Sequence, residues 1–229
     1  MPGASYPVSY SIERPERYNR WTVFFRAILI IPQLILFSGF PFRLFIPIFG
    51  NDNVAAVVIL QVLSVISLSL VLAFLVFLAW FAILFSGRFP QGFLKTCLYI
   101  FRWQQNVYAY YYLLAEPYPP FADGPYDLDL SIVPTEQHNR LTVFFRFFLA
   151  IPHYIVLWAL GIAAFFVTIV AWFAILFTGR YPAGMYDFTV GVARWGARVG
   201  AYALLFVDDY PPFSLSDEPG AMGLQPEPA

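Results

Sequence analysis

One twelve-residue stretch decides the fold, because the chain contains it twice. It reads AWFAILFSGRFP at residues 79–90 and AWFAILFTGRYP at residues 171–182, an offset of 92 residues (171 − 79). The same offset joins YPPF at residues 118–121 to YPPF at residues 210–213. Matches this long at a constant spacing indicate a duplicated module.

Upstream of this stretch the repeat continues at a different offset. NRWTVFFR at residues 19–26 recurs as NRLTVFFR at residues 139–146, which is 120 residues later (139 − 19). The first copy therefore carries 28 additional residues (120 − 92), between residues 33 and 78. Each NR-x-TVFFR segment is apolar between arginines, which favours a helix that enters a membrane from the headgroup region. Pro32 and Pro152 are expected to kink or terminate these helices.

Each module contains a long run without a charged residue. Residues 54–86 and residues 147–179 each hold 33 residues without Asp, Glu, Lys or Arg. A membrane span needs roughly 20 residues, and a straight helix of 33 would be about 50 Å long. Residues 27–49 of the first copy are predicted to form either a further span or a re-entrant hairpin. Gly87 and Gly179 are predicted to take the left-handed conformation that ends a helix.

Composition assigns the chain to the membrane class. Of its 229 residues, 60% are hydrophobic and 12% are charged, against about 25% charged in an average soluble domain. The formal charge of −1 argues against nucleic acid as a partner, since such proteins need a clustered basic excess. The single cysteine, Cys97, excludes an intrachain disulfide.

Two further elements complete each module. Apolar residues alternate with polar or small ones over residues 6–12 and 126–132, which predicts strands that either pair with each other or remain extended tails. Residues 91–116 and 184–206 predict amphipathic helices with a basic stripe. These helices either lie in the membrane interface or span it with the stripe turned inward.

Seven arginines are candidate contacts to lipid headgroups or to an anionic ligand bound between the modules, and six of them pair up between the copies. They are Arg26, Arg146, Arg88, Arg180, Arg102, Arg194 and Arg198. The alternative is plain interfacial anchoring and helix capping. His138 and His153 are expected to form hydrogen bonds rather than to bind a metal. The sequence contains no catalytic motif, so we expect no enzyme, no cofactor and no metal site.

The repeated residues resemble a bacterial membrane family, the domain of unknown function DUF4389. The resemblance lies in FAILFTGRYP at residues 173–182, in Arg194-Trp195, in YPPF at residues 210–213 and in Ile151-Pro152-His153. The first copy departs from the last motif, since Gln33 follows Pro32. The resemblance implies two tandem copies in a multi-pass membrane protein, and it supplies no activity.

These patterns together predict an all-α membrane protein. It consists of two tandem repeats of a long transmembrane helix plus an amphipathic helix, with a small two-stranded β element outside the bilayer. The modules are residues 6–121 and 126–213, and residues 214–229 form a disordered tail. The arginine distribution favours cytoplasmic termini.

The predicted function is to organise membrane lipids, partner membrane proteins or other copies of the chain. The alternative is a transporter, or another membrane protein that binds an anionic ligand, with a polar site between the modules. A transporter would need the Arg102 and Arg194 stripes to face each other across a cavity.

Overall fold

The computed structural model describes residues 6–33, 68–121 and 124–216, and everything below concerns these residues. The elements, in chain order, are β1 (Val8–Ile12), α1 (Arg20–Leu29), α5 (Leu68–Ser86), α6 (Gln91–Tyr111), β2 (Leu128–Ile132), α7 (Arg140–Thr178) and α8 (Ala183–Ala203). The helical content and the small sheet agree with the predicted fold class. Three predicted features lie partly outside the described residues. They are residues 54–67 of the first uncharged run, most of the further span or hairpin at residues 27–49, and residues 217–229 of the predicted disordered tail.

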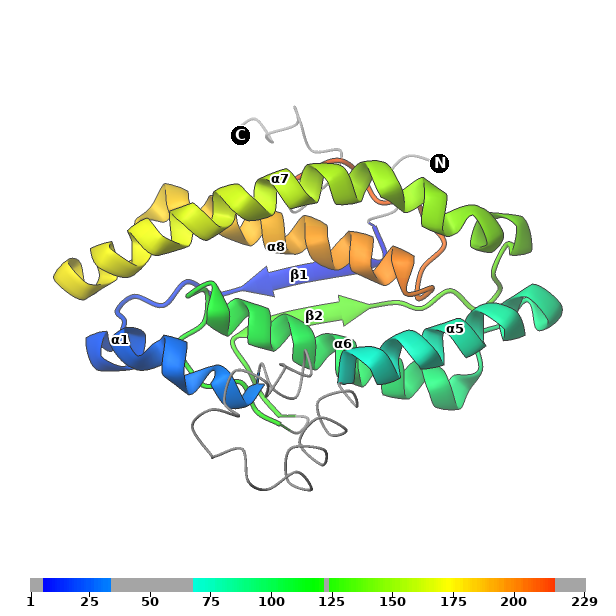
Figure 1. The fold of residues 1–229 in the computed structure, drawn as a ribbon, viewed down its shortest axis with the longest axis horizontal. Helices are drawn as coiled ribbons and strands as arrows, with labels where there is room; N and C mark the ends of the chain where they lie inside the picture. Colours follow the sequence, from blue (N-terminus) through cyan, green and yellow to red (C-terminus); the bar gives the residue numbers. More distant parts are fainter. Residues whose placement is uncertain (1–5, 34–67, 122–123, 217–229) are drawn as a thin grey trace, which may run out of the picture.

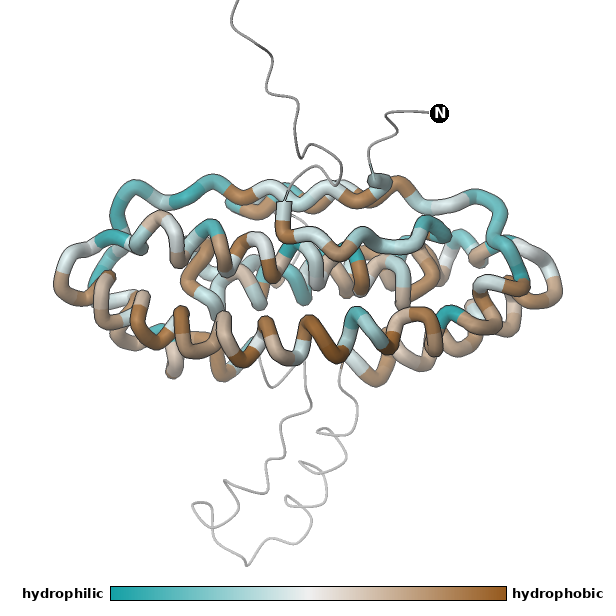
Figure 2. Tube along the Cα trace, turned by 90° about the horizontal axis from the view of Figure 1, so that it is seen from above, coloured by the Kyte–Doolittle hydropathy of each residue, from teal (hydrophilic) through white to brown (hydrophobic). Residues whose placement is uncertain are grey.

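The elements form three layers (Figures 1 and 2). The strands make one outer layer, α6 and α8 lie in the middle, and α1, α5 and α7 make the other outer layer. Figure 2 shows that hydrophobic residues concentrate in the layer of α1, α5 and α7, whereas the strand layer and the loops at its ends are largely hydrophilic. The molecule is therefore a slab with one apolar and one polar side.

The two strands pair in antiparallel register, as one of the two sequence alternatives predicted. Tyr10 lies opposite Leu130, and both side chains are buried. The alternate residues Ser9, Asp129 and Ser131 are exposed. Because side chains alternate along each strand, the two-stranded sheet has one face packed on α6 and α8 and one face open to water.

Helix α7 runs uninterrupted for 39 residues, about 58 Å at 1.5 Å per residue. Pro152 lies inside it, so of the two predicted outcomes termination does not occur. In the first half, α1 ends at Leu29, shortly before Pro32, and α5 supplies the counterpart of the later part of α7. Gly87 and Gly179 have φ of 74° and 75°, which confirms the predicted left-handed caps.

The two halves contact each other through equivalent pairs of hydrogen bonds. Trp80 Nε1 donates to the carbonyl of Val143, and Trp172 Nε1 donates to that of Val23. The backbone N–H of Tyr18 bonds to Gly179, and that of His138 bonds to Gly87. Likewise β1 packs on α8 and β2 packs on α6. The halves therefore interlock, because each supplies a strand and hydrogen-bond donors that pack on the helices and helix ends of the other.

Candidate membrane-binding face

The layer of α1, α5 and α7 exposes large hydrophobic side chains, and we call this surface the apolar face. Trp21, Trp158 and Phe177 are each more than 70% exposed. Two helices, Leu68–Ser86 and Arg140–Thr178, are long and apolar enough to cross a membrane, and only 17% of the most apolar window of each is buried. A core helix of a soluble protein would be mostly buried instead. Contiguous exposed apolar surface of this kind marks a membrane or protein interface.

One stripe of α7 packs against the middle layer, and it explains which side becomes the apolar face. The stripe includes Val143, Arg146, Ala150 and His153, all buried at intervals of three or four residues. Such spacing places side chains on one side of a helix. Helices α1 and α5 pack along its two borders. Much of the remaining α7 surface is hydrophobic and exposed, as at Phe147, Ile155 and Phe166.

Arginine pairs stand at the two ends of the apolar face. The Arg20 side chain lies over Gly179, with its Nε 3.7 Å from the position of an added Cβ, and the exposed Arg180 follows. At the other end Arg140 lies over Gly87 at the same distance, and the exposed Arg88 follows. We call these the Arg20/Arg180 corner and the Arg140/Arg88 corner. Each corner combines one arginine from each half.

Arg26 and Arg146 are buried beneath the apolar face. Arg26 donates to the carbonyls of Tyr110 and Ala115, and Arg146 donates to those of Tyr202 and Val207. Each guanidinium also lies over a tyrosine ring, at 4.2 Å from Tyr110 and 4.6 Å from Tyr202. Both arginines therefore bind carbonyl groups at the protein's own helix ends. This corrects the prediction that they contact lipid headgroups or an anionic ligand.

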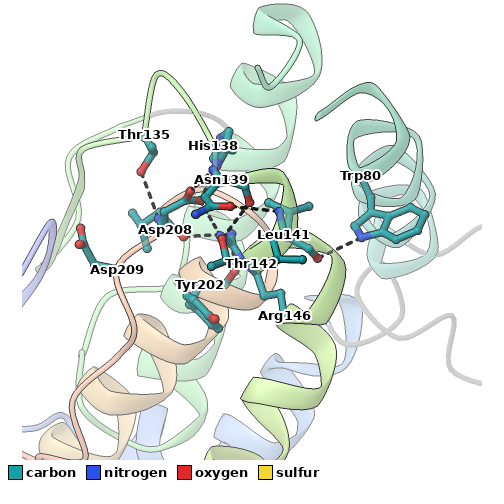
Figure 3. A network of polar contacts seen from close by, with 12 residues as sticks. Trp80, Thr135, His138, Asn139, Leu141, Thr142, Arg146, Tyr202, Asp208 and Asp209 are labelled. Atoms are coloured by element: carbon teal, nitrogen blue, oxygen red, sulfur yellow. Dashed lines mark hydrogen bonds and ion pairs between the residues drawn. The ribbon is translucent and has the colours of Figure 1, made fainter. Parts of the chain in front are cut away.

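Asp208 organises a polar network in the second half (Figure 3). Its carboxylate accepts hydrogen bonds from Arg146, from His138 Nδ1 and from the backbone N–H of Asn139. Burial raises the pKa of Asp208, but these donors outweigh it and bring the pKa down to about 2. The network fixes the start of α7 to the segment that follows α8.

The first half contains a reduced version of this network. Glu116 accepts the backbone N–H of Asn19, and Tyr18, which takes the place of His138, donates its hydroxyl to the carbonyl of Leu113. Neither Glu116 nor Asp208 was among the candidate site residues predicted from the sequence. Their signal was present, since each stands two residues before its YPPF segment, at the repeat offset of 92.

Arg102 and Arg194 of the two basic stripes have separate surroundings in the described structure. Arg194 donates to the carbonyls of Tyr10 and Leu215, and Arg198 is 1% exposed and donates to the carbonyls of Ser214 and Ser216. Arg102 is exposed and lines a separate hollow of about 390 Å³ beside β2. Arg194 and Arg198 thus hold residues 214–216, so the predicted disordered tail cannot begin before residue 217.

The two predicted hydrogen-bonding histidines have protein partners. Nδ1 of His153 accepts from Trp195 Nε1 at 3.2 Å, and its ring stacks on Phe213. His138 bonds to Asp208, as described above. Within the described residues, no group of three or more His, Cys, Asp or Glu residues has an arrangement that could hold a metal ion.

Comparison with known proteins gives one match. Searches of curated proteins and of solved structures found none. Residues 140–214, about a third of the chain, match the family described as "Domain of unknown function (DUF4389)". The match runs from the first residue of α7 to the segment held by Arg198. It supports the resemblance to DUF4389 for the second half of the chain.

Proposed function

We propose that the protein is a non-catalytic membrane protein that places its apolar face in lipid and organises lipids, partner membrane proteins or other copies of itself. The observation that carries the proposal is the segregation of the slab into an exposed apolar side and a polar side. Burying that apolar side in hydrocarbon is favourable by about 25 cal/mol per Å². The polar groups beneath it support a structural role, since Asp208, His138 and Arg146 bind one another and the backbone.

We further propose that α7 lies in the plane of the membrane. The two strands run in roughly the same direction as α7, on the opposite side of the slab (Figures 1 and 2). If α7 crossed the bilayer, the exposed Ser9, Asp129 and Ser131 would lie at hydrocarbon depth, where unpaired polar groups are costly. At about 58 Å, α7 is also nearly twice as long as the roughly 30 Å hydrocarbon core. The multi-pass arrangement predicted from the sequence would need other copies or an aqueous path to cover the two strands.

Two finer features belong to this proposal. The first is that residues 6–121 form a second, diverged DUF4389 copy, which the paired contacts of Trp80 and Trp172 support. The second is a location at the cell membrane, with the strand layer and termini toward the cytoplasm. Its basis is the excess of arginines before and between the modules. The separate surroundings of Arg102 and Arg194 give the transporter alternative no support.

Single cysteines in a Cys97→Ala background test the arrangement in reconstituted vesicles. We expect Leu141→Cys and Thr178→Cys, near the two ends of α7, to react with a membrane-impermeant thiol reagent from the same side as Ser131→Cys. Phe166→Cys, on the apolar face, should be protected by lipid and should contact spin-labelled acyl chains.

Labelling of the two α7 ends from opposite sides would establish a spanning helix and contradict the in-plane arrangement. Free reaction of Phe166→Cys with the impermeant reagent would contradict membrane embedding itself. Cross-linking of Phe166→Cys between copies, with no contact to lipid, would show that a second copy covers the apolar face.

A further inference from the structure

Two equivalent grooves lie along the borders of α7 in the apolar layer. One has a volume of about 360 Å³ and lies between α1 and the later part of α7, with Arg26, Ala27 and Trp172 in its lining. The other, about 450 Å³, lies between α5 and the start of α7, with Trp80, Arg146 and Phe147 in its lining. Each residue of the first set has its counterpart in the second at a repeat offset. Both volumes fall within the range of roughly 300–1,000 Å³ that is usual for ligand sites.

A buried arginine lies in the wall of each groove with one donor unused. Arg26 and Arg146 are 3% and 2% exposed, and the Nε–H of each has no acceptor among the described residues. Buried donors of this kind are uncommon in folded proteins. Arg26 also forms no ion pair with a described carboxylate, whereas Arg146 pairs with Asp208. The first groove therefore has a positive charge behind it that is not neutralised by a direct partner.

Each groove lies near one of the arginine corners in the sequence. Trp172 precedes Arg180 by eight residues, and Trp80 precedes Arg88 by the same number, about 12 Å at the helix rise of 1.5 Å per residue. One leaflet of a bilayer is about 15 Å of hydrocarbon, half of the roughly 30 Å core. An acyl chain of about that length can thus reach from either corner into its groove if it lies along α7, parallel to the membrane plane.

The corners themselves have unbalanced positive charge. Arg20, Arg180, Arg140 and Arg88 form no ion pair with any carboxylate in the described structure. The acidic residues nearest in sequence, Glu16 and Glu136, are exposed and likewise unpaired. A phosphate bound at either corner would supply the missing negative charge, since phosphates pair readily with guanidinium groups.

We propose that each half-to-half border is a binding site for one anionic phospholipid. The arginine corner holds the phosphate, and the adjoining groove holds an acyl chain. The inference rests on the proposed membrane association, because the lipid enters from the layer in contact with the apolar face. The site at the Arg20/Arg180 corner is the more selective for anionic lipid, since Arg26 adds a positive charge there. These sites would give the protein its means of organising lipids.

Native mass spectrometry of the full chain in detergent tests the inference with phosphatidylglycerol as the probe. We expect two retained lipids per chain, and fewer with phosphatidylcholine. Arg20→Gln with Arg180→Gln should weaken one site about 30-fold, since each arginine near a charged group contributes about one kcal/mol. The control is Arg14→Gln with Arg102→Gln, which makes the same charge change elsewhere on the exposed surface and should keep both sites.

A second pair of variants tests the groove without a change of charge. Ala27→Trp narrows the first groove, whereas Ala159→Trp adds the same ring to an exposed position of α7 that lines neither groove. We expect only Ala27→Trp to lose a lipid. Equal lipid retention by all four variants would overturn the inference. Displacement of the lipid by inorganic phosphate at matched concentration would also overturn it, because the acyl chain would then contribute nothing to binding. If the cysteine labelling still places Phe166→Cys in lipid, the proposed function stands while this inference fails.

Discussion

Arg26 and Arg146 occupy equivalent positions of the repeat, yet their surroundings differ in charge. Arg146 pairs with Asp208, which also binds His138, so three side chains form one charged network. Arg26 has only carbonyl acceptors and a tyrosine ring, and Glu116 bonds to the backbone of Asn19 instead. The two halves thus share the position of a buried cation but differ in what neutralises it. The second half should depend on its carboxylate far more than the first half.

The largest effect should come from removing the two carboxylates in turn. Asp208→Ala leaves Arg146 and His138 buried without their acceptor, and we expect a loss of about 3–5 kcal/mol in the free energy of unfolding. Glu116→Ala removes an acceptor from one backbone N–H and should cost about 1 kcal/mol. Denaturant unfolding in detergent measures both values. Equal losses would mean that the two networks are energetically alike.

Acid should act on the second half through the same residue. The pKa of Asp208 is about 2 in the folded chain, below its ordinary value of 3.8. Its contribution is therefore complete above pH 3.8 and is lost as the pH falls toward 2, by about 2 kcal/mol. Asp208→Asn should abolish this part of the acid dependence, and Glu116→Gln should leave it intact. An unchanged pH profile in Asp208→Asn would assign acid sensitivity to other groups.

Substitutions at the helix C-terminal caps should have equal effects in the two halves, because the cap geometry is the same in both. Gly87→Val and Gly179→Val should each cost about 1–2 kcal/mol, since a residue with a Cβ is strained at a φ near 75°. Ser86→Ala and Thr178→Ala remove a hydroxyl that accepts the N–H of the arginine two residues later, and should cost about 0.5–1 kcal/mol. Thermal unfolding of the four variants compares them. A harmless valine at either position would argue against a capping role there.

The smallest effect is expected at the start of the helices. Asn19 and Asn139 each accept the backbone N–H two residues later at 3.0 Å, as helix N-caps. Replacement of either by alanine should cost about 1 kcal/mol or less. The two values should agree, and a marked difference would show that the charged network changes the strength of the side-chain cap.

Local rules explain which features could be predicted from the sequence. The left-handed glycines follow from the sequence Ser/Thr-Gly-Arg-aromatic-Pro, and the strands follow from a period of two, because both depend on near neighbours in the chain. The exchange between halves could not be predicted in this way. Identical signals in both copies allow each strand to pack on the amphipathic helix of either half, and only tertiary packing selects the other half.

The arginines show most clearly which properties follow from the sequence and which follow from the tertiary structure. The sequence by itself determined the internally repeated motifs, the apolar composition, the helix ends and the paired arginines, since these are properties of residue order and composition. Tertiary structure decided that Arg26, Arg146 and Arg198 are buried and bind carbonyls, and that Arg20 meets Gly179 across the two halves. A helical stripe specifies the side of a helix on which an arginine lies, but it does not specify what packs against that side. The neighbour decides, because a guanidinium group is stable both in water and in a buried site that supplies enough acceptors.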